Sequence, residues 1–256
     1  MVKPRYIIYN DEAIAGIKVA ARMAATAKNR IAKAVCVGMT TMQIDQLAGD
    51  IIRDLGGVPT FFGYYGYPGQ ICISVNDEVA HGIGSHTKVI VNGDLVSIDV
   101  GVTYGGYIGD NALSFIVGEP TDREDVELLR ATGQALMAGL MAARAGNFVK
   151  DIGVAVEKIA NSAKLAVVRE YVGHGCGIEL HEPPEVPNFA TSETGPLLRP
   201  GMVLCIEPMF NLGSNKVYTE SDDWTVRTRD GKKSAHFEHM VLVTKTDPEI
   251  LTWQKT

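Results

Sequence analysis

The sequence predicts a single mixed α/β (α+β) domain made of two similar halves. Three observations support this: apolar residues recur with helical spacing in two separate regions, each region is followed by segments rich in glycine and β-branched residues, and this order repeats. The 256 residues can form one large core, and no Pro- or Ser-rich stretch marks a linker. We therefore expect one domain over residues 1–256, with half-repeats at about 10–118 and 121–252.

The first half is expected to open with two helices. Apolar residues spaced by three and four positions predict a helix that begins after Asn10, whose side chain is a suitable cap. A second helix is expected after Thr40 and Thr41, and it should end at Gly56 and Gly57. Strands are then expected at 71–75, 89–91 and 94–103.

The second half repeats this order. Thr121 and Glu124 have the spacing of a capping box, which predicts a third helix that ends at Gly146. Asn147 is expected to cap a fourth helix. Strands are then expected at 166–171, 202–206 and 240–244.

Two matching strings relate the halves. A glycine stands six residues before an isoleucine at 38–44 and again at 146–152. The segment Gly-Asp-Leu-Val-Ser-Ile-Asp at 93–99 matches Gly-Met-Val-Leu-Cys-Ile-Glu at 201–207. Both matches have an offset of 108 residues, and the second superposes two carboxylates. A shared offset predicts two halves related by a pseudo-two-fold axis, each contributing an acid from an equivalent strand.

Composition excludes several classes of function. The net charge of −6 argues against a nucleic-acid partner, and the basic run at 227–233 is interrupted by Asp230 and Gly231. No apolar stretch approaches the ~20 residues of a membrane helix, and Lys3, Pro4 and Arg5 interrupt any targeting sequence. Four scattered cysteines without a CxxC pair indicate reduced thiols. We expect a cytoplasmic monomer with no membrane partner.

Asp99 and Asp110 flank a turn expected near Tyr104, Gly105 and Gly106. They are almost equally distant from its centre, so a hairpin would bring them within a register step of each other. Two carboxylates in that position repel, and such a pair needs a cation or a raised pKa. Taken alone, the pair is equally compatible with two acids on a solvated hairpin face.

Three further residues favour a metal site. His174 stands between glycines, where the backbone can approach closely, although a lone histidine is usually structural. Glu207 lies inside an apolar run, and Glu238 immediately precedes a strand; an unpaired buried charge costs several kcal/mol. Two cations shared among four carboxylates and one imidazole explain all five residues together. A ligand set without thiolate suits Mn, Fe, Co or Zn in a hydrolytic pair.

The strings around these residues resemble type I methionine aminopeptidases, in order, from about residue 10 to Thr252. The matching strings are Asn76-x-x-x-x-His81-Gly82-Ile83, Gly93-Asp-x-Val-x-Ile-Asp99, Gly109-Asp110, Gly173-His174-Gly-x-Gly, His181-Glu182, Pro200-Gly-Met-x-x-x-Ile-Glu207-Pro and Glu238-His239. The resemblance implies the pita-bread fold, in which helices cover a central curved antiparallel sheet with the metal pair at its centre. It also implies an aminopeptidase that removes the N-terminal methionine from proteins and peptides with a small second residue.

The resemblance further implies a role for each site residue. Asp99 would hold one of two divalent ions (Co, Mn, Fe or Zn), His174 and Glu207 would hold the other, and Asp110 and Glu238 would bridge them. Glu207 would also shuttle protons. His81 and His181 would contact the scissile amide, and the methionine pocket maps onto Tyr64, Tyr67, Cys72 and Trp224. The remaining histidines and cysteines are expected to be structural: His86, His236, His239, Cys36, Cys176 and Cys205.

Five positions depart from the family pattern: Tyr65, Gly84, Asn111, Cys176 and Leu180. None is a metal ligand. Leu180 replaces an aromatic residue just before the second histidine, and Gly84 stands where proline is usual. These two departures are expected to alter the shape of the substrate pocket.

Two alternatives remain open at this point. Proline-directed peptidases of the same fold usually have an extra N-terminal domain and an arginine shortly before the last ligand. Here a helix is expected almost at once, and the approach to the last ligand is Ala235-His236-Phe237-Glu238. A non-catalytic binding relative would typically lack metal ligands, whereas all five are present.

Overall fold

The computed structural model describes residues 6–253. The expected domain limits at residues 1 and 256, and the expected interruption of a targeting sequence by Lys3, Pro4 and Arg5, lie outside this range. No helix within residues 6–253 has both the length and the apolar character needed to cross a bilayer.

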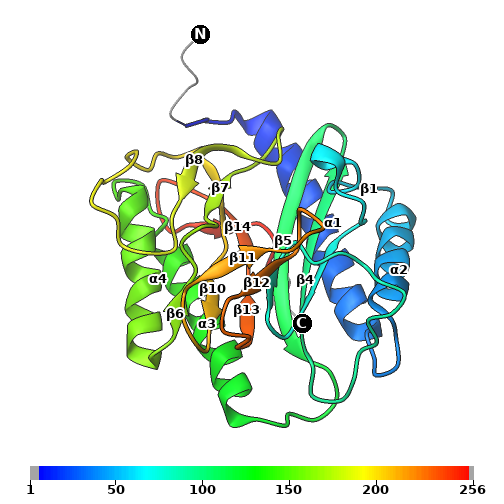
Figure 1. Cartoon of the computed structure of the whole chain (residues 1–256). Helices are drawn as coiled ribbons and strands as arrows, with labels where there is room; N and C mark the ends of the chain where they lie inside the picture. Colours follow the sequence, from blue (N-terminus) through cyan, green and yellow to red (C-terminus); the bar gives the residue numbers. More distant parts are fainter. Residues whose placement is uncertain (1–5, 254–256) are drawn as a thin grey trace.

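Four long helices form where the apolar periodicity predicts them: α1 (Asp11–Ala34), α2 (Thr41–Asp54), α3 (Arg123–Ala142) and α4 (Val149–Ala163). Asn10 caps α1 as predicted, because its side chain accepts a hydrogen bond of 2.9 Å from the Ala13 amide. Thr40 and Gln43 form a reciprocal capping box at the start of α2. Helices α1 and α2 flank one side of the strands, and α3 and α4 flank the other (Figure 1).

Two predicted caps are wrong. The cap of α3 is Asp122 rather than Thr121, and its carboxylate accepts from the Glu124 amide at 2.9 Å. Asn147 does not cap α4; its side chain donates to the Ala142 carbonyl at the end of α3, also at 2.9 Å. The first turn of α4 is held by Asp151, which accepts from the Phe148 amide at 2.7 Å. Asn147 therefore satisfies an orphan carbonyl of the preceding helix.

The strands form antiparallel pairs in four small sheets. In the first, β4 (Leu95–Tyr104) pairs with β5 (Tyr107–Ile116), β2 (Cys72–Val75) and β1 (Val58–Pro59). The largest has the order β15 (Glu249–Ile250), β14 (His239–Leu242), β9 (Val203–Ile206), β7 (Gly173–Gly175) and β8 (Glu182–Val186). The two others are β13 (Ser234–His236), β10 (Met209–Asn211) and β6 (Ala166–Val167), and β11 (Val217–Thr219), β12 (Val226–Thr228) and β3 (Glu78–Ala80). A short 3-10 helix, η1 (Tyr64–Gly66), completes the elements.

Two predicted strands are shorter or missing. Residues 89–91 make only an isolated pairing between Val89 and Thr40, because this segment runs past the start of α2, where the Lys88 carbonyl accepts from the Thr41 amide at 2.9 Å. Of the strand expected at 166–171, only Ala166–Val167 pairs with β10. The other predicted strands form within a few residues of their expected limits.

The two halves of the chain meet where β5 runs beside β13 and β14 (Figure 1). The Glu238 amide donates to the Ala112 carbonyl at 3.1 Å. The hydroxyl of Ser114 donates to the His236 carbonyl and accepts from the His236 amide, both at 2.8 Å. These bonds fix the last strands of the second half against the hairpin of the first.

Matched backbone conformations are consistent with the predicted half-repeats. Gly93 and Gly201 both have left-handed φ values, +88° and +93°, shortly before β4 and β9. Gly38 and Gly146 likewise have φ values of +93° and +94°. A residue with a side chain rarely adopts this conformation, so glycine is needed at the same place in each half.

The contact of β5 with β13 and β14 forms a seam between the two halves. Apolar packing holds the strands in place on both sides of this seam. Ile31 of α1 and Ile52 of α2 are fully buried against Ile98 of β4, and Ile152 of α4 packs with Ile206 of β9 in a second cluster. Each such side chain contributes about 1.5–3 kcal/mol. The acidic residues at the seam are thus held by well-packed elements of both halves.

Candidate metal and substrate site

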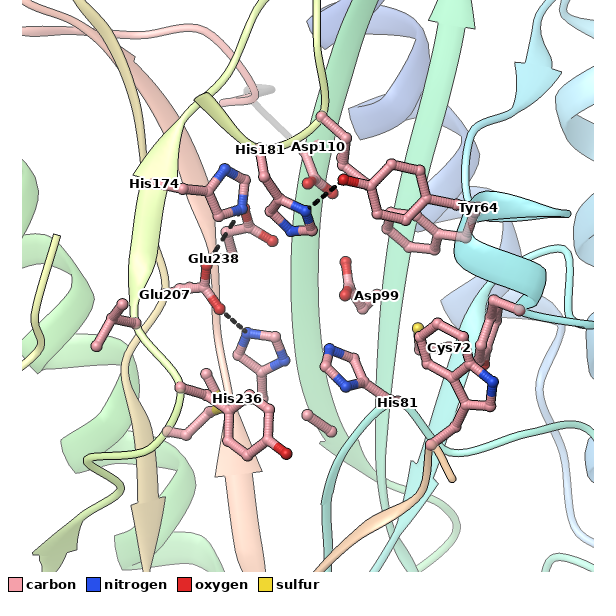
Figure 2. A pocket seen from close by; sticks show the side chains of 18 of the residues that line it. Tyr64, Cys72, His81, Asp99, Asp110, His174, His181, Glu207, His236 and Glu238 are labelled. Atoms are coloured by element: carbon pink, nitrogen blue, oxygen red, sulfur yellow. Dashed lines mark hydrogen bonds and ion pairs between the residues drawn. The ribbon is translucent and has the colours of Figure 1, made fainter. Parts of the chain in front are cut away.

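A cavity of about 300 Å³ opens at the seam between the halves. Every predicted site residue lines it: Tyr67 and Trp224, together with Tyr64, Cys72, His81, Asp99, Asp110, His174, His181, Glu207 and Glu238, which are labelled in Figure 2. Residues up to 174 positions apart in the sequence therefore converge on one space. Their chemical roles follow from the geometry described next.

Asp99 and Asp110 are diagonal neighbours in the β4–β5 hairpin. Asp99 lies opposite Ala112, and Asp110 lies opposite Gly101, so the register refines the sequence prediction by placing the acids diagonally rather than directly opposite each other. Diagonal residues share a face of a hairpin and remain within reach. The two carboxyl groups are close enough for the charge of Asp99 to raise the pKa of Asp110.

The glycines beside His174 permit a close approach of strands. A Cβ atom at Gly173 would lie 2.3 Å from the Cys205 carbonyl, and one at Gly175 would lie 2.7 Å from the Pro183 carbonyl. The His174 Nδ1 lies 2.9 Å from the Gly175 carbonyl, which can only accept, so we assign the hydrogen to Nδ1. The unprotonated Nε2 then faces the cavity, 3.4 Å from Glu207 Oε1.

Burial raises the pKa values of the acid cluster. It raises the pKa of Asp99 to about 7, and it raises the pKa values of Asp110, Glu207 and Glu238 well above their usual range. Neighbouring carboxylates raise the last three further. Burial also lowers the pKa of Lys28 on α1 to about 8, although Glu238 and Asp99 act in the opposite direction. Bringing four acids together in a nearly buried space is therefore unfavourable without a cation.

The orphaned atoms of the cluster fit a divalent metal. Within residues 6–253, Asp99 Oδ1, Asp110 Oδ1 and Glu238 Oε1 are buried and accept no hydrogen bond. Buried polar atoms normally have a partner, and unpaired carboxylate oxygens facing one cavity are what a bound cation would satisfy. Carboxylates together with an imidazole suit Mn, Fe, Co or Zn.

Cys205 also lies close to this group. One ligand atom from each of Asp110, His174, Glu238 and Cys205 lies within 4.8 Å of the others. Burial raises the pKa of the Cys205 thiol well above its usual range, and the charge of Glu238 raises it further. A protonated thiol is a poor metal ligand, so Cys205 is not assigned to the ligand set.

The two predicted amide-contacting histidines remain neutral near pH 7. Burial lowers the pKa of His81 to about 4 and also lowers the pKa of His181. The Tyr64 hydroxyl lies 2.8 Å from His181 Nδ1, and the rings of His174 and His181 stand edge to face, 4.4 Å apart. His181 is thus held at the cavity mouth, beside the predicted ligands.

The predicted methionine pocket is an aromatic and sulfur-lined part of the same cavity. Tyr67 and Trp224 pack edge to face with ring centroids 5.1 Å apart, and Cys72 is buried in the same cluster. Leu180 is 3% exposed and lines the cavity, as its position beside His181 predicts.

The other departures from the family pattern have different surroundings. Tyr65 is 87% exposed at the cavity mouth, and Asn111 and Cys176 are buried outside the lining. Gly84 does not line the cavity, and its expected effect on the shape of the pocket stays a prediction. A Cβ atom there would lie 3.0 Å from the Asp45 Cβ, so Gly84 packs against α2 instead.

Sequence reasoning missed part of the lining: Phe61, Ala80, Tyr171, Val172, Met209 and His236. His236, expected to be structural, is the most consequential. Its side chain faces the cavity beside Glu207 (Figure 2). The signal was available, because alternate residues of an extended segment share a face and Glu238 is two residues away.

Comparison with known proteins shows the family to which this chain belongs. A profile of metallopeptidase family M24 matches residues 15–245. The chain is 44% identical to methionine aminopeptidase 1 of Bacillus subtilis over 233 residues, which cover 91% of this chain and 93% of that protein. It is 43% identical to the methionine aminopeptidase of Clostridium acetobutylicum, covering 96% and 98% of the two chains. The crystal structure of methionine aminopeptidase from Thermotoga maritima matches with a TM-score of 0.94 at 40% identity, covering 97% of this chain and all of that one.

The chain therefore belongs to metallopeptidase family M24. Within this family, its similarity is to the methionine aminopeptidases, and the resemblance predicted from the motifs is confirmed. A prolidase from Pyrococcus furiosus shares the fold with a TM-score of 0.78, but at 22% identity and with 66% of its length covered. The pita-bread fold and the metallopeptidase class are confirmed. The comparison also favours a methionine aminopeptidase over a proline-directed peptidase.

Proposed function

We propose that this protein removes the N-terminal methionine from peptides and nascent proteins whose second residue is small. The observation that carries the proposal is that a single cavity joins an orphaned acid cluster to an aromatic and sulfur-lined compartment. The first suits a hydrolytic metal centre, and the second suits a thioether side chain.

The acid cluster would hold two divalent ions, Co, Mn, Fe or Zn. We assign Asp99 to one ion and His174 with Glu207 to the other. Asp110 and Glu238 would be shared by both ions, as the resemblance implies, and one ligand atom of each lies within 4.8 Å of the other and of a His174 nitrogen. When bound, the ions would polarise the peptide carbonyl and lower the pKa of a water.

Glu207 is placed to move protons. Burial and the charges of Asp99 and Asp110 raise its pKa well above the usual range, which favours the protonated form of the carboxyl in the metal-free protein. The side chain is 12% exposed and faces the cavity. We assign it to take a proton from the attacking water and to deliver it to the leaving amine.

His81 and His181 are assigned to the scissile amide. If the Tyr64 hydroxyl donates to His181 Nδ1, then His181 Nε2 carries a hydrogen and can donate to the oxygen on which negative charge develops. Burial raises the pKa of Tyr64, which keeps the phenol protonated for this purpose. His81 contributes a second neutral imidazole from the opposite wall (Figure 2).

The methionine side chain would lie against Tyr67, Cys72 and Trp224, near Tyr64. A contact between sulfur and an aromatic ring contributes about 0.3–1.5 kcal/mol. The small cavity leaves little room beyond one such chain, which supports a small second residue. That the protein is a cytoplasmic monomer without a nucleic-acid partner remains a prediction of the sequence.

Peptide turnover by metal-depleted protein tests the proposal. Each of Mn, Co, Fe and Zn is added back, and kcat/KM is compared for matched peptides that begin Met-Ala, Met-Arg and Ala-Pro. We expect no activity without metal, restoration by at least one ion, and a strong preference for Met-Ala. Full activity after stringent metal removal, equal rates for Met-Ala and Met-Arg, or faster cleavage of Ala-Pro would contradict it.

A further inference from the structure

The loop at 176–181, which joins β7 to β8, brings Leu180 and His181 to the cavity. Leu180 is buried, but His181 is exposed, so packing alone does not fix the direction of its side chain. The Tyr64 hydroxyl contacts one nitrogen of the His181 ring (Figure 2). Because this contact holds only the end of the side chain, the position of His181 also depends on the backbone of its own loop.

The carboxylate of Glu182, the residue directly after His181, holds this backbone. Its Oε1 atom accepts a hydrogen bond of 3.0 Å from the Ile178 amide and one of 2.8 Å from the Glu179 amide. The Glu182 side chain is buried and does not line the cavity. Hydrogen bonds from amides to a carboxylate are stronger than those to a neutral acceptor. The loop is therefore bent back onto Glu182 immediately before His181.

Tyr9 connects this carboxylate to the segment that precedes α1. Its hydroxyl lies 2.6 Å from both oxygens of Glu182, and it accepts from the Ile178 amide at 3.1 Å. Burial raises the pKa of the Tyr9 phenol, so the hydroxyl keeps its proton and can donate to the carboxylate. The Tyr9 ring covers Gly177, where a Cβ atom would lie only 2.7 Å from the ring. Glycine is thus needed at 177 to admit the Tyr9 ring.

Both sides of this arrangement are attached to strands of the site. The Tyr9 amide donates to the Gly201 carbonyl, shortly before β9, at 2.9 Å. The Gly177 carbonyl accepts from the amide of Ile108 at 2.8 Å, and Ile108 lies on β5 two residues before Asp110. The position of His181 is therefore referred to the same strands that carry the predicted metal ligands.

We propose that Tyr9 and Glu182 are positioning residues for His181, which they hold at the distance from the metal site that the reaction requires. The inference rests on the proposed function, because His181 is assigned there to the scissile amide. A displacement of about 1 Å in a group that contacts the reacting atoms can cost about 100-fold in rate. Loss of the Tyr9 hydroxyl should therefore lower kcat although Tyr9 does not line the cavity.

A double-mutant cycle with His181 tests this coupling. Tyr9→Phe removes the hydroxyl and keeps the ring against Gly177. It is measured alone and combined with His181→Ala, on a Met-Ala peptide and with the same metal added to each protein. Thr132→Val is the matched control, because the Thr132 hydroxyl is also buried, donates to the Leu128 carbonyl at 2.7 Å, and belongs to α3 outside the cavity lining.

We expect Tyr9→Phe to lower kcat by about tenfold with unchanged metal content, and to change kcat by less than about twofold once His181 is alanine. Thr132→Val should leave kcat unchanged in both backgrounds. A general loss of stability would not depend on the residue at 181. An equal loss of kcat in both backgrounds, or no loss when His181 is present, would overturn the inference.

Hydrogen exchange of the Ile178 and Glu179 amides in the metal-free proteins gives a readout without turnover. Tyr9→Phe should accelerate the exchange of both amides by about fivefold, and Thr132→Val should not. Unchanged exchange in Tyr9→Phe would contradict this inference alone. A wild-type protein that does not cleave Met-Ala peptides with any metal would contradict the proposed function. Wild-type kcat in His181→Ala would contradict both the assigned role of His181 and the positioning of it by Tyr9.

Discussion

Replacement of Asp99 by asparagine should stabilise the metal-free protein and destabilise the metal-loaded one. Asp99 Oδ1 is buried without a partner, and burial raises the pKa of the carboxyl from 3.8 to about 7. The folded protein therefore retains a proton that the unfolded chain has lost. The unfolding free energy of the metal-free protein consequently falls as pH rises from about 4 to about 7.

The size of the effect follows from the same pKa. At 1.36 kcal/mol per pH unit, a rise from 3.8 to about 7 corresponds to about 4 kcal/mol once the pH exceeds 7. Asparagine keeps the shape and has no charge to bury, so Asp99→Asn should recover up to about 4 kcal/mol in metal-free protein above pH 7. Below pH 4 the gain should vanish. With metal bound, the same change removes a ligand, and the sign should reverse.

Urea unfolding at pH 4 and pH 8, with EDTA or with saturating Mn²⁺ or Co²⁺, measures both signs. Asp125→Asn is the matched control, because Asp125 is 1% exposed but paired with Lys233 at 2.6 Å. Breaking that pair should destabilise the protein with and without metal, by about 3–5 kcal/mol for a fully buried pair and less here. The reasoning is refuted if Asp99→Asn destabilises the metal-free protein at pH 8, or if its effect is the same at both pH values.

Three further predictions concern catalysis. Glu207→Gln should lose most of its kcat yet keep a cooperative unfolding transition, because the amide preserves the shape of the side chain but cannot carry a proton. Turnover and thermal unfolding are measured on the same sample. A substantial residual kcat would show that Glu207 does not transfer the proton. Tyr64→Phe should lower kcat/KM by about 10- to 100-fold with unchanged metal content, because the substitution removes the hydroxyl that contacts His181 Nδ1. If the variant has the same kinetics as the wild-type protein, the contact has no catalytic role. Leu180→Phe should sharpen the preference for Met over norleucine by up to about tenfold, because an aromatic ring adds a contact with the substrate sulfur. This requires that the buried site accepts the larger side chain. An unchanged ratio of kcat/KM for the two substrates would mean that residue 180 does not contact the substrate side chain.

Local sequence patterns predicted the helices because helical periodicity is a property of neighbouring residues. Asn10 caps α1 as expected, since a suitable side chain stands at the last extended residue before the apolar series, and Thr40 does the same for α2. At α3 and α4, several adjacent residues can all cap, and the choice between them depends on about 1 kcal/mol. Tertiary contacts decide such cases, and Asn147 bonds to the preceding helix instead.

The sequence predicted the residues that line the cavity more completely than the strand pairing that brings them together. Acids in apolar surroundings, such as Glu207, need an explanation wherever the strands lie, so the acids that line the cavity could be identified in the sequence. The diagonal placement of Asp99 and Asp110 could not, because it depends on the turn conformation at Gly105 and Gly106. His236 could have been predicted from its position two residues before Glu238, whereas the Ser114 contact that fixes its backbone, more than a hundred residues away, could not.

The placement of the acids at the seam explains why one cavity can serve both stability and chemistry. Asp99 and Asp110 are held by the β4–β5 hairpin, whereas Glu207 directly follows β9 and Glu238 directly precedes β14 in the second half, so neither half alone assembles the cluster. Burying one unpaired carboxylate costs several kcal/mol, whereas a domain is stable by only about 5–15 kcal/mol in total. Four such groups can therefore be tolerated only if they keep their protons or bind cations, and the raised pKa values show the first solution in the metal-free protein. Metal binding exchanges those protons for ions, and it should consequently tighten the contact between the halves at β5 and β14.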